Sequence, residues 1–105
     1  SRWERIVENH KMTTPTTIEA AELIEKTCND VRDLLLGKNA AYGNSALDPV
    51  RIFSKSSPVE QLLVRLDDKL SRIARGTAAG EDVEWDLLGY LVLLRVARQL
   101  EKRGT

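Results

Sequence analysis

The feature that most constrains the fold is a helical period in three separate stretches of the chain, two of which open with a capping box. Residues 16–19 (TTIE) and 57–60 (SPVE) each place a hydroxyl side chain three positions before a glutamate. This pattern caps free N–H groups at the start of a helix. Apolar residues then recur every three or four positions, which predicts an all-α fold with a three-helix core over about 16–36, 58–75 and 82–102.

Glycines and breakers divide these stretches. Gly37 is a natural stop for the first helix, and the turn from Gly76 to Gly80 predicts that the second and third helices form an antiparallel hairpin. Residues 1–15 have mixed charge followed by a breaker stretch. We therefore interpret them as an N-terminal arm ahead of a single helical domain over 16–105.

The predicted third helix is apolar nearly all round. A three-helix domain of this size can bury only one face of such a helix. We therefore predict that the second face meets another copy of the chain in a homo-oligomer. In the first helix, Cys28 lies within the apolar stripe and is predicted to be buried packing rather than a reactive thiol.

Composition excludes several classes of function. The chain has 105 residues, enough for one domain, and its 16 Lys and Arg residues balance 16 Asp and Glu residues. A general nucleic-acid coat would need a basic excess. One cysteine and one histidine are too few for a structural zinc site. No apolar run reaches the about 20 residues of a membrane span and no signal-peptide pattern opens the sequence, so we expect a cytoplasmic protein.

The connection over 37–57 is longer than a plain turn, and connections of this length are usually functional or disordered. Its apolar residues favour an ordered loop, because they can anchor it to the core. These predicted anchors are Tyr42, Leu47, Val50, Ile52 and Phe53.

The same loop carries three cations and one carboxylate, and it ends at a helix N-terminus, where free N–H groups and the helix dipole favour an anion. We therefore predict a phosphate site formed by Ser57 and the first-turn amides and closed by Lys55 or Arg51. Tyr42 offers a face on which a base could stack, and two asparagines of the loop, Asn39 and Asn44, offer hydrogen bonds to its edge. The alternative is a plain turn and cap with solvated charges.

A carboxylate on the third helix needs a partner. Asp86 lies at the border of the main apolar stripe, where unpaired burial costs several kcal/mol. The hairpin brings Lys69 and Arg72 opposite it, so an ion pair is the preferred interpretation. The alternative is a Mg²⁺ site, in which two carboxylates one helical turn apart share the ion with a third from the second helix. The carboxylates predicted to hold this metal are Asp67, Asp68, Asp82 and Asp86.

Four ordered motifs lie at 38–43 (KNAAYG), 49–54 (PVRIFS), 63–72 (LVRLDDKLSR) and 86–91 (DLLGYL). Together they resemble a family of small phage and bacterial proteins, the nucleotide-modification-associated domain of the first type, over about 18–100. The resemblance implies a helical domain found in phage genomes near genes of nucleotide metabolism and base modification, with no established reaction. The residues carried over from the family pattern are Lys38, Asn39, Tyr42, Gly43, Arg51, Asp67, Asp68, Lys69, Arg72, Asp86 and Tyr90.

The architecture is also similar to that of MazG-type all-α nucleoside triphosphate pyrophosphohydrolases. Those enzymes hold Mg²⁺ with an ExxE pair on one helix and an ExxD pair on the next. Residues 19–22 (EAAE) have the first spacing, but no ExxD pair follows. The sequence thus departs from that pattern where the chemistry would take place.

The leading hypothesis is a phage-type protein that binds or sequesters a nucleotide or nucleotide-derived signal, as an anti-defence protein would, through the 37–57 loop and the start of the second helix. No residue is singled out as catalytic. The alternatives are a Mg²⁺-dependent nucleoside triphosphate pyrophosphohydrolase and a structural helical oligomer or adaptor. The predicted ligand-binding residues are Lys38, Asn39, Tyr42, Asn44, Arg51, Lys55, Ser57, Lys69, Arg72 and Tyr90.

Overall fold

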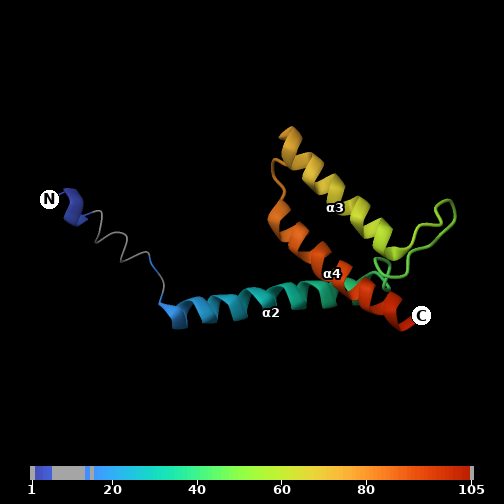
Figure 1. Ribbon diagram of the computed structural model, residues 1–105, viewed down its shortest axis with the longest axis horizontal. Helices are drawn as coiled ribbons and strands as arrows, with labels where there is room; N and C mark the ends of the chain where they lie inside the picture. The colour runs from blue at the N-terminus through green and yellow to red at the C-terminus, as the bar shows by residue number, and fades with distance from the viewer. Residues whose placement is uncertain (1, 6–13, 15, 105) are drawn as a thin grey trace. The chain divides into compact units, whose positions relative to one another are not determined.

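The computed structural model describes residues 2–5, 14 and 16–104, and in this part of the chain it is helical without any strand. The all-α prediction is therefore confirmed. Three long helices follow one another, α2 (Thr17–Ala41), α3 (Pro58–Arg75) and α4 (Val83–Gly104) (Figure 1). None of the described helices is both long and apolar enough to cross a membrane.

The chain divides into two compact units, residues 1–33 and 34–105. The second unit holds the C-terminal end of α2, the long connection, α3 and α4. Most of the predicted N-terminal arm over 1–15 lies outside the described residues. The boundary between arm and helical domain therefore stays a prediction.

Side-chain caps begin all three long helices. Thr16 and Glu19 form the reciprocal capping box, in which Thr16 Oγ1 accepts the Glu19 N–H at 3.0 Å and Glu19 Oε2 accepts the Thr16 N–H at 3.3 Å. Ser57 Oγ accepts the Glu60 N–H at 3.1 Å at the start of α3. Asp82 Oδ1 accepts the Trp85 N–H at 3.1 Å at the start of α4. Both predicted capping boxes thus mark true helix starts.

The hairpin of α3 and α4 is closed by a glycine that takes a left-handed conformation. Gly76 has φ 69°, and its N–H and the following Thr77 N–H bond to the carbonyls of Ile73 and Arg72. This arrangement satisfies the last carbonyls of α3 and reverses the chain. The two helices then run side by side and antiparallel, as predicted (Figure 1).

The core of the second unit lies between α3 and α4. Leu62 is its most buried side chain, with 1% exposed. Leu47 from the long connection packs on the same cluster and holds that connection to the hairpin. The buried members of the core are Val59, Leu62, Leu66, Leu94 and Ala97.

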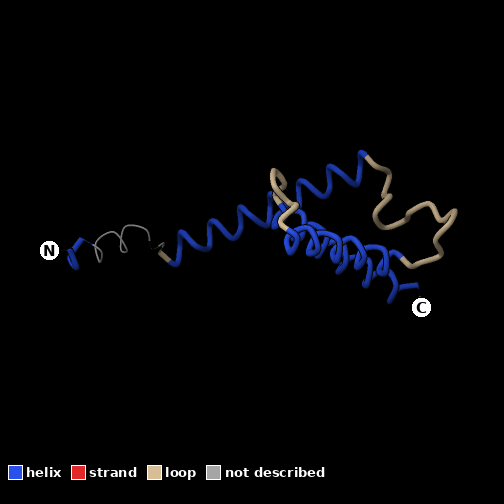
Figure 2. The backbone as a smooth tube through the Cα atoms, turned by 90° about the horizontal axis from the view of Figure 1, so that it is seen from above, coloured by secondary structure: helices blue, strands red, loops and turns tan. Residues whose placement is uncertain are grey.

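The prediction that Gly37 ends the first helix is wrong. α2 continues to Ala41, and Gly37 has no positive φ. The reversal comes later, where Gly43 (φ 60°) and Asn44 (φ 68°) are both left-handed and the Asn44 N–H bonds back to the Asn39 carbonyl at 3.2 Å. The alanines after Gly37 favour helix, so the helix continues through this glycine, which destabilises it by about 1 kcal/mol relative to alanine. The connection is therefore shorter than predicted and spans 42–57 (Figure 2).

Several predicted buried residues are exposed. Among the loop anchors, Val50, Ile52 and Phe53 are 83%, 77% and 99% exposed, and Leu47 alone packs on the core. Cys28 is also exposed, so its assignment to buried packing is wrong. Apolar periodicity predicts which residues share a face but not whether a partner covers that face.

The second face of α4 is partly exposed as well. Of the residues predicted on this face, Leu88, Val92 and Leu100 are 37%, 38% and 43% exposed. Surfaces of this kind often mark contacts with another protein. The homo-oligomer stays a prediction, which these exposed residues motivate.

The core can be tested with two substitutions two positions apart on α3. Leu62→Ala removes the most buried side chain, and we expect a loss of about 2–5 kcal/mol in the free energy of unfolding. Val64→Ala, at a residue 65% exposed, should change it by about 0.5 kcal/mol or less. Urea unfolding followed by circular dichroism measures both. Equal losses in the two variants would contradict the placement of the core.

The course of α2 can be tested with a pair of glycine substitutions of opposite sign. Gly37→Ala should stabilise the protein by about 0.5–1 kcal/mol, because Gly37 lies inside a helix and an added Cβ meets nothing within 4 Å. Gly76→Ala should destabilise it by about 1 kcal/mol, because its φ is positive. Thermal unfolding measures both. A destabilised Gly37→Ala variant would mean that the helix ends at Gly37 after all.

Candidate functional site

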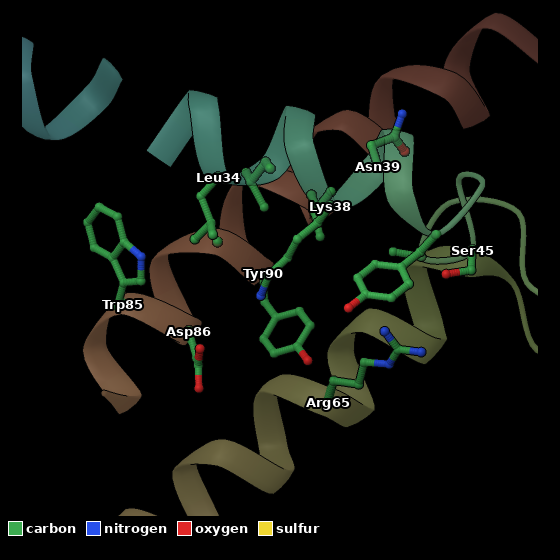
Figure 3. A pocket seen from close by; sticks show the side chains of 13 residues that line it. Leu34, Lys38, Asn39, Ser45, Arg65, Trp85, Asp86 and Tyr90 are labelled. Atoms are coloured by element: carbon green, nitrogen blue, oxygen red, sulfur yellow. The ribbon is translucent and has the colours of Figure 1, made fainter. Parts of the chain in front are cut away.

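A pocket of about 260 Å³ lies within the second unit, where the end of α2 meets α3 and α4. All of its lining residues belong to residues 34–105, so one compact unit forms it. Figure 3 shows side chains from the three helices around the pocket, with Tyr90 in the middle. The lining residues are Leu34, Leu35, Lys38, Asn39, Tyr42, Ser45, Ala46, Arg65, Trp85, Asp86, Gly89, Tyr90 and Leu93.

The α2 side of the pocket exists because the helix continues past Gly37. Residues 34, 35, 38, 39 and 42 follow a helical spacing, so an unbroken helix places them within one arc of its surface. Had the chain turned at Gly37, Lys38 and Tyr42 would have left that arc. On the facing helix, Gly89 is buried, and the Leu35 side chain of α2 lies beside it, at an ordinary contact distance of 3.5 Å from where a Cβ would stand.

A cationic face of α3 lies across from the start of α4. Lys69 Nζ is 3.1 Å from Asp86 Oδ2 and 3.4 Å from Glu81 Oε2. One helical turn further along α3, Arg72 Nη1 is 2.7 Å from Glu81 Oε1, and Arg72 Nε is 3.3 Å from Asp68 Oδ2. The ion pair predicted for Asp86 is therefore confirmed, with Lys69 as its partner.

Lys69 is the least exposed member of this network, with 15% of its side chain accessible. Its hydrogen bond to Asp86 is the largest effect on it and raises the pKa of Lys69 above the ordinary value of 10.5. Burial opposes this effect by disfavouring the charged ammonium, and the charges of Asp86 and Glu81 add to the rise. Lys69 is therefore charged throughout the physiological range, and it holds Asp86 at the edge of the pocket.

The two other cations at the pocket have no carboxylate partner among the described residues. Lys38 and Arg65 line the pocket, and neither forms an ion pair within this part of the chain. Three aromatic side chains, Tyr42, Trp85 and Tyr90, line the same pocket. Cations without partners beside aromatic rings can bind an anionic group joined to a planar ring.

The structure divides the predicted ligand-binding residues between different places. Lys38, Asn39, Tyr42 and Tyr90 come together at the pocket, and Lys69 and Arg72 form the ion-pair network beside it. The remaining predicted residues do not line the pocket. They are Asn44, Arg51, Lys55 and Ser57. Ser57 caps α3 with its own hydroxyl, which thereby occupies one of the N–H groups proposed for a phosphate.

The four carboxylates predicted to hold Mg²⁺ have separate roles in the described chain. Asp86 pairs with Lys69, Asp68 with Arg72, and Asp82 caps α4, while Asp67 is exposed. Within residues 2–5, 14 and 16–104, no group of three or more acidic, histidine or cysteine side chains is close enough to share a metal ion. The described residues of one chain therefore give the predicted metal site no support.

Sequence reasoning missed three polar or aromatic contributors to the pocket, Ser45, Arg65 and Trp85, of which Arg65 and Trp85 matter most. A signal for Arg65 was present, because Arg65, Lys69 and Arg72 follow the i, i+4, i+7 spacing of one helix face. Trp85 directly precedes Asp86, but its position in the sequence is equally compatible with a pocket residue and with a residue at an oligomer contact. Ser45 and Ala46 enter only because the chain reverses at Gly43 and Asn44.

Compared with family models, curated proteins and solved structures, the chain shows no match. The resemblance to the nucleotide-modification-associated domain therefore stays a prediction, carried by the four motifs of the sequence.

The Lys69 network predicts a specific loss of stability at alkaline pH. Because the folded pKa of Lys69 is raised, its stabilisation is fully present below 10.5 and is lost as pH rises through the higher folded value. A Lys69→Gln variant should be less stable than the wild type at neutral pH, and the difference should shrink above 10.5. Urea unfolding at a series of pH values measures it.

Lys26→Gln is the matched control, because it removes a lysine whose pair with Asp30 is 69% and 47% exposed. Exposed pairs of this kind contribute about 0–1 kcal/mol, so its difference from the wild type should be small at every pH. If the difference in the free energy of unfolding between the wild type and Lys69→Gln stays constant with pH, the ion pair does not explain the stability of the site.

Proposed function

We propose that this protein binds a nucleotide or a nucleotide-derived signal in the pocket between the end of α2, α3 and α4. The observation that carries the proposal is the pair of cations, Lys38 and Arg65, without carboxylate partners among the described residues, at a pocket that three aromatic side chains also line. Arginine and lysine bind phosphate oxygens through charge-assisted hydrogen bonds. Stacking of a base on an aromatic ring contributes about 1–3 kcal/mol to the free energy of binding.

The size of the pocket sets the size of the ligand unit. Its volume of about 260 Å³ is just below the about 300–1,000 Å³ of pockets that enclose a drug-sized molecule. One nucleoside phosphate unit is therefore the fitting occupant, and a larger signal would extend beyond the pocket. Tyr42 lines the pocket and is 68% exposed, so it could contact the part of a larger ligand that extends out of the pocket.

Binding is better supported than hydrolysis. A Mg²⁺-dependent pyrophosphohydrolase needs several carboxylates around the metal. Of the four carboxylates considered for this role, Asp68 and Asp86 are engaged in ion pairs and Asp82 in a helix cap. The exposed apolar side chains of α4 support a homo-oligomer as the working form. In this proposal the protein is a phage-type sequestering protein of the host cytoplasm.

The first experiment separates binding from turnover. The purified protein is incubated with Mg²⁺ and a panel of nucleoside triphosphates, cyclic dinucleotides and ADP-ribose derivatives, then filtered out and heated to release its ligand. Chromatography of both fractions should show one species removed from the filtrate and recovered intact. A species converted to monophosphate and pyrophosphate would favour the hydrolase, and an unchanged panel would favour a structural oligomer.

The two cations give the sharpest mutational test. Lys38→Gln and Arg65→Gln should each weaken nucleotide binding by about ten-fold or more, because each removes a charge-assisted hydrogen bond of about 1.5–3 kcal/mol. Isothermal titration calorimetry with the recovered species measures the affinity. Circular dichroism checks that both variants stay folded.

Lys55→Gln is the control, because Lys55 is an exposed cation that does not line the pocket. Its affinity should match the wild type. If Lys55→Gln abolishes binding while Arg65→Gln does not, the ligand binds at the start of α3, as the sequence alone suggested, and not in the pocket.

A further inference from the structure

The pocket has one acidic side chain, and that side chain is fixed in position. Asp86 lines the pocket, and its Oδ2 is 3.1 Å from Lys69 Nζ. Its second oxygen, Oδ1, accepts no hydrogen bond from the described residues. The side chain is 35% exposed, so a ligand in the pocket can reach it.

The charges of the pocket are separated in space. Figure 3 shows Arg65 and Asp86 on opposite sides of Tyr90, with Trp85 on the Asp86 side. Lys38 extends from α2 toward Tyr90 between them (Figure 3). Arg65 offers donors to a phosphate, whereas the Asp86 carboxylate offers only acceptors, so a phosphate is favoured at Arg65 and a donor group of the ligand at Asp86.

We infer that Asp86 is a specificity-determining residue, which accepts a hydrogen bond from an O–H or N–H group of the bound nucleotide while Arg65 and Lys38 hold its phosphate. This inference rests on the proposed function and adds the orientation and the selectivity of the site. The donor is either the ribose 2′-hydroxyl or an exocyclic amino group of the base. A ligand without that donor leaves a carboxylate oxygen unsatisfied, which is how polar sites reject close analogues.

The chemistry of Asp86→Asn makes it an informative variant. The atom that faces Lys69 must remain an acceptor, because the ammonium has only donors. Asparagine therefore turns its oxygen toward Lys69 and presents its NH₂ group to the pocket. The substitution replaces an acceptor by a donor at the ligand while Lys69 keeps Glu81 as its charged partner.

The test uses the four ribonucleoside 5′-monophosphates, their 2′-deoxy forms and inosine 5′-monophosphate, with calorimetry or ligand-detected NMR as the readout. In the wild type, loss of one donor should weaken binding by about ten-fold. A difference between ribo and deoxy forms identifies the 2′-hydroxyl. A difference between AMP or GMP and inosine monophosphate, or between CMP and UMP, identifies an amino group.

Asp86→Asn should abolish that selectivity, and Glu81→Gln is its matched control. Both variants remove a carboxylate that contacts Lys69, but only Asp86 lines the pocket. We expect Glu81→Gln to keep the ten-fold preference even if it lowers stability. Thermal unfolding confirms that each variant is folded under the assay conditions.

The failures are distinguishable. If none of the nine nucleotides binds the wild type, the proposed function of this pocket falls and the inference falls with it. If they bind and Arg65→Gln weakens them, but no donor matters and Asp86→Asn behaves as the wild type, the nucleotide site stands and the role of Asp86 is refuted. Loss of selectivity in both Glu81→Gln and Asp86→Asn would also refute the role of Asp86. The loss would then result from disturbing the ion-pair network of Lys69 and not from a contact of Asp86 with the ligand.

Discussion

Lys69 crosses from α3 to two carboxylates near the start of α4, and both the hairpin and the pocket depend on this crossing. Asp86 stands beside apolar neighbours, where a carboxylate without a cation would lose hydration and gain nothing in return. With Lys69 at 3.1 Å, Asp86 keeps a fixed position at the pocket edge. The interaction that joins the two helices thus also contributes to the polarity of the pocket, which has one fixed acceptor and two cations without a carboxylate partner among the described residues.

The fold could be predicted from the sequence wherever local chemistry decides it. Both capping boxes and the left-handed Gly76 are local signals, and the structure confirms all three. Gly37 failed as a helix stop because its permissive backbone allows a turn without requiring one. The alanines that follow favoured continuation, and the reversal came at Gly43 and Asn44. Val50, Ile52 and Phe53 failed as anchors because apolar character alone does not supply a surface to pack on.

The candidate site could be predicted only in part, for a related reason. The predicted site residues of two distant stretches include Lys38, Asn39, Tyr42, Asp86 and Tyr90, and all five line the pocket. Lys55 and Ser57 were chosen because a helix N-terminus attracts anions, a property shared by every helix. Arg65 was missed because a solvated cation on a helix and a cation at a pocket have the same sequence pattern. Only the tertiary path of α2 distinguishes the two cases. The prediction that α2 ends at Gly37 gave the wrong path.

The charges at the pocket bear on whether it binds or transforms its ligand. In the proposed site, Lys38 and Arg65 supply positive charge for a phosphate, and such charge gives affinity whether or not a reaction follows. Catalysis would require a group whose interaction strengthens only as bonds break, such as a metal ion held by several carboxylates. Three of the four carboxylates considered for such a metal are engaged elsewhere, Asp86 with Lys69, Asp68 with Arg72 and Asp82 in the cap of α4. Within the described part of the chain, this arrangement supports the proposal that the pocket binds a nucleotide, with Asp86 as the residue proposed to select it.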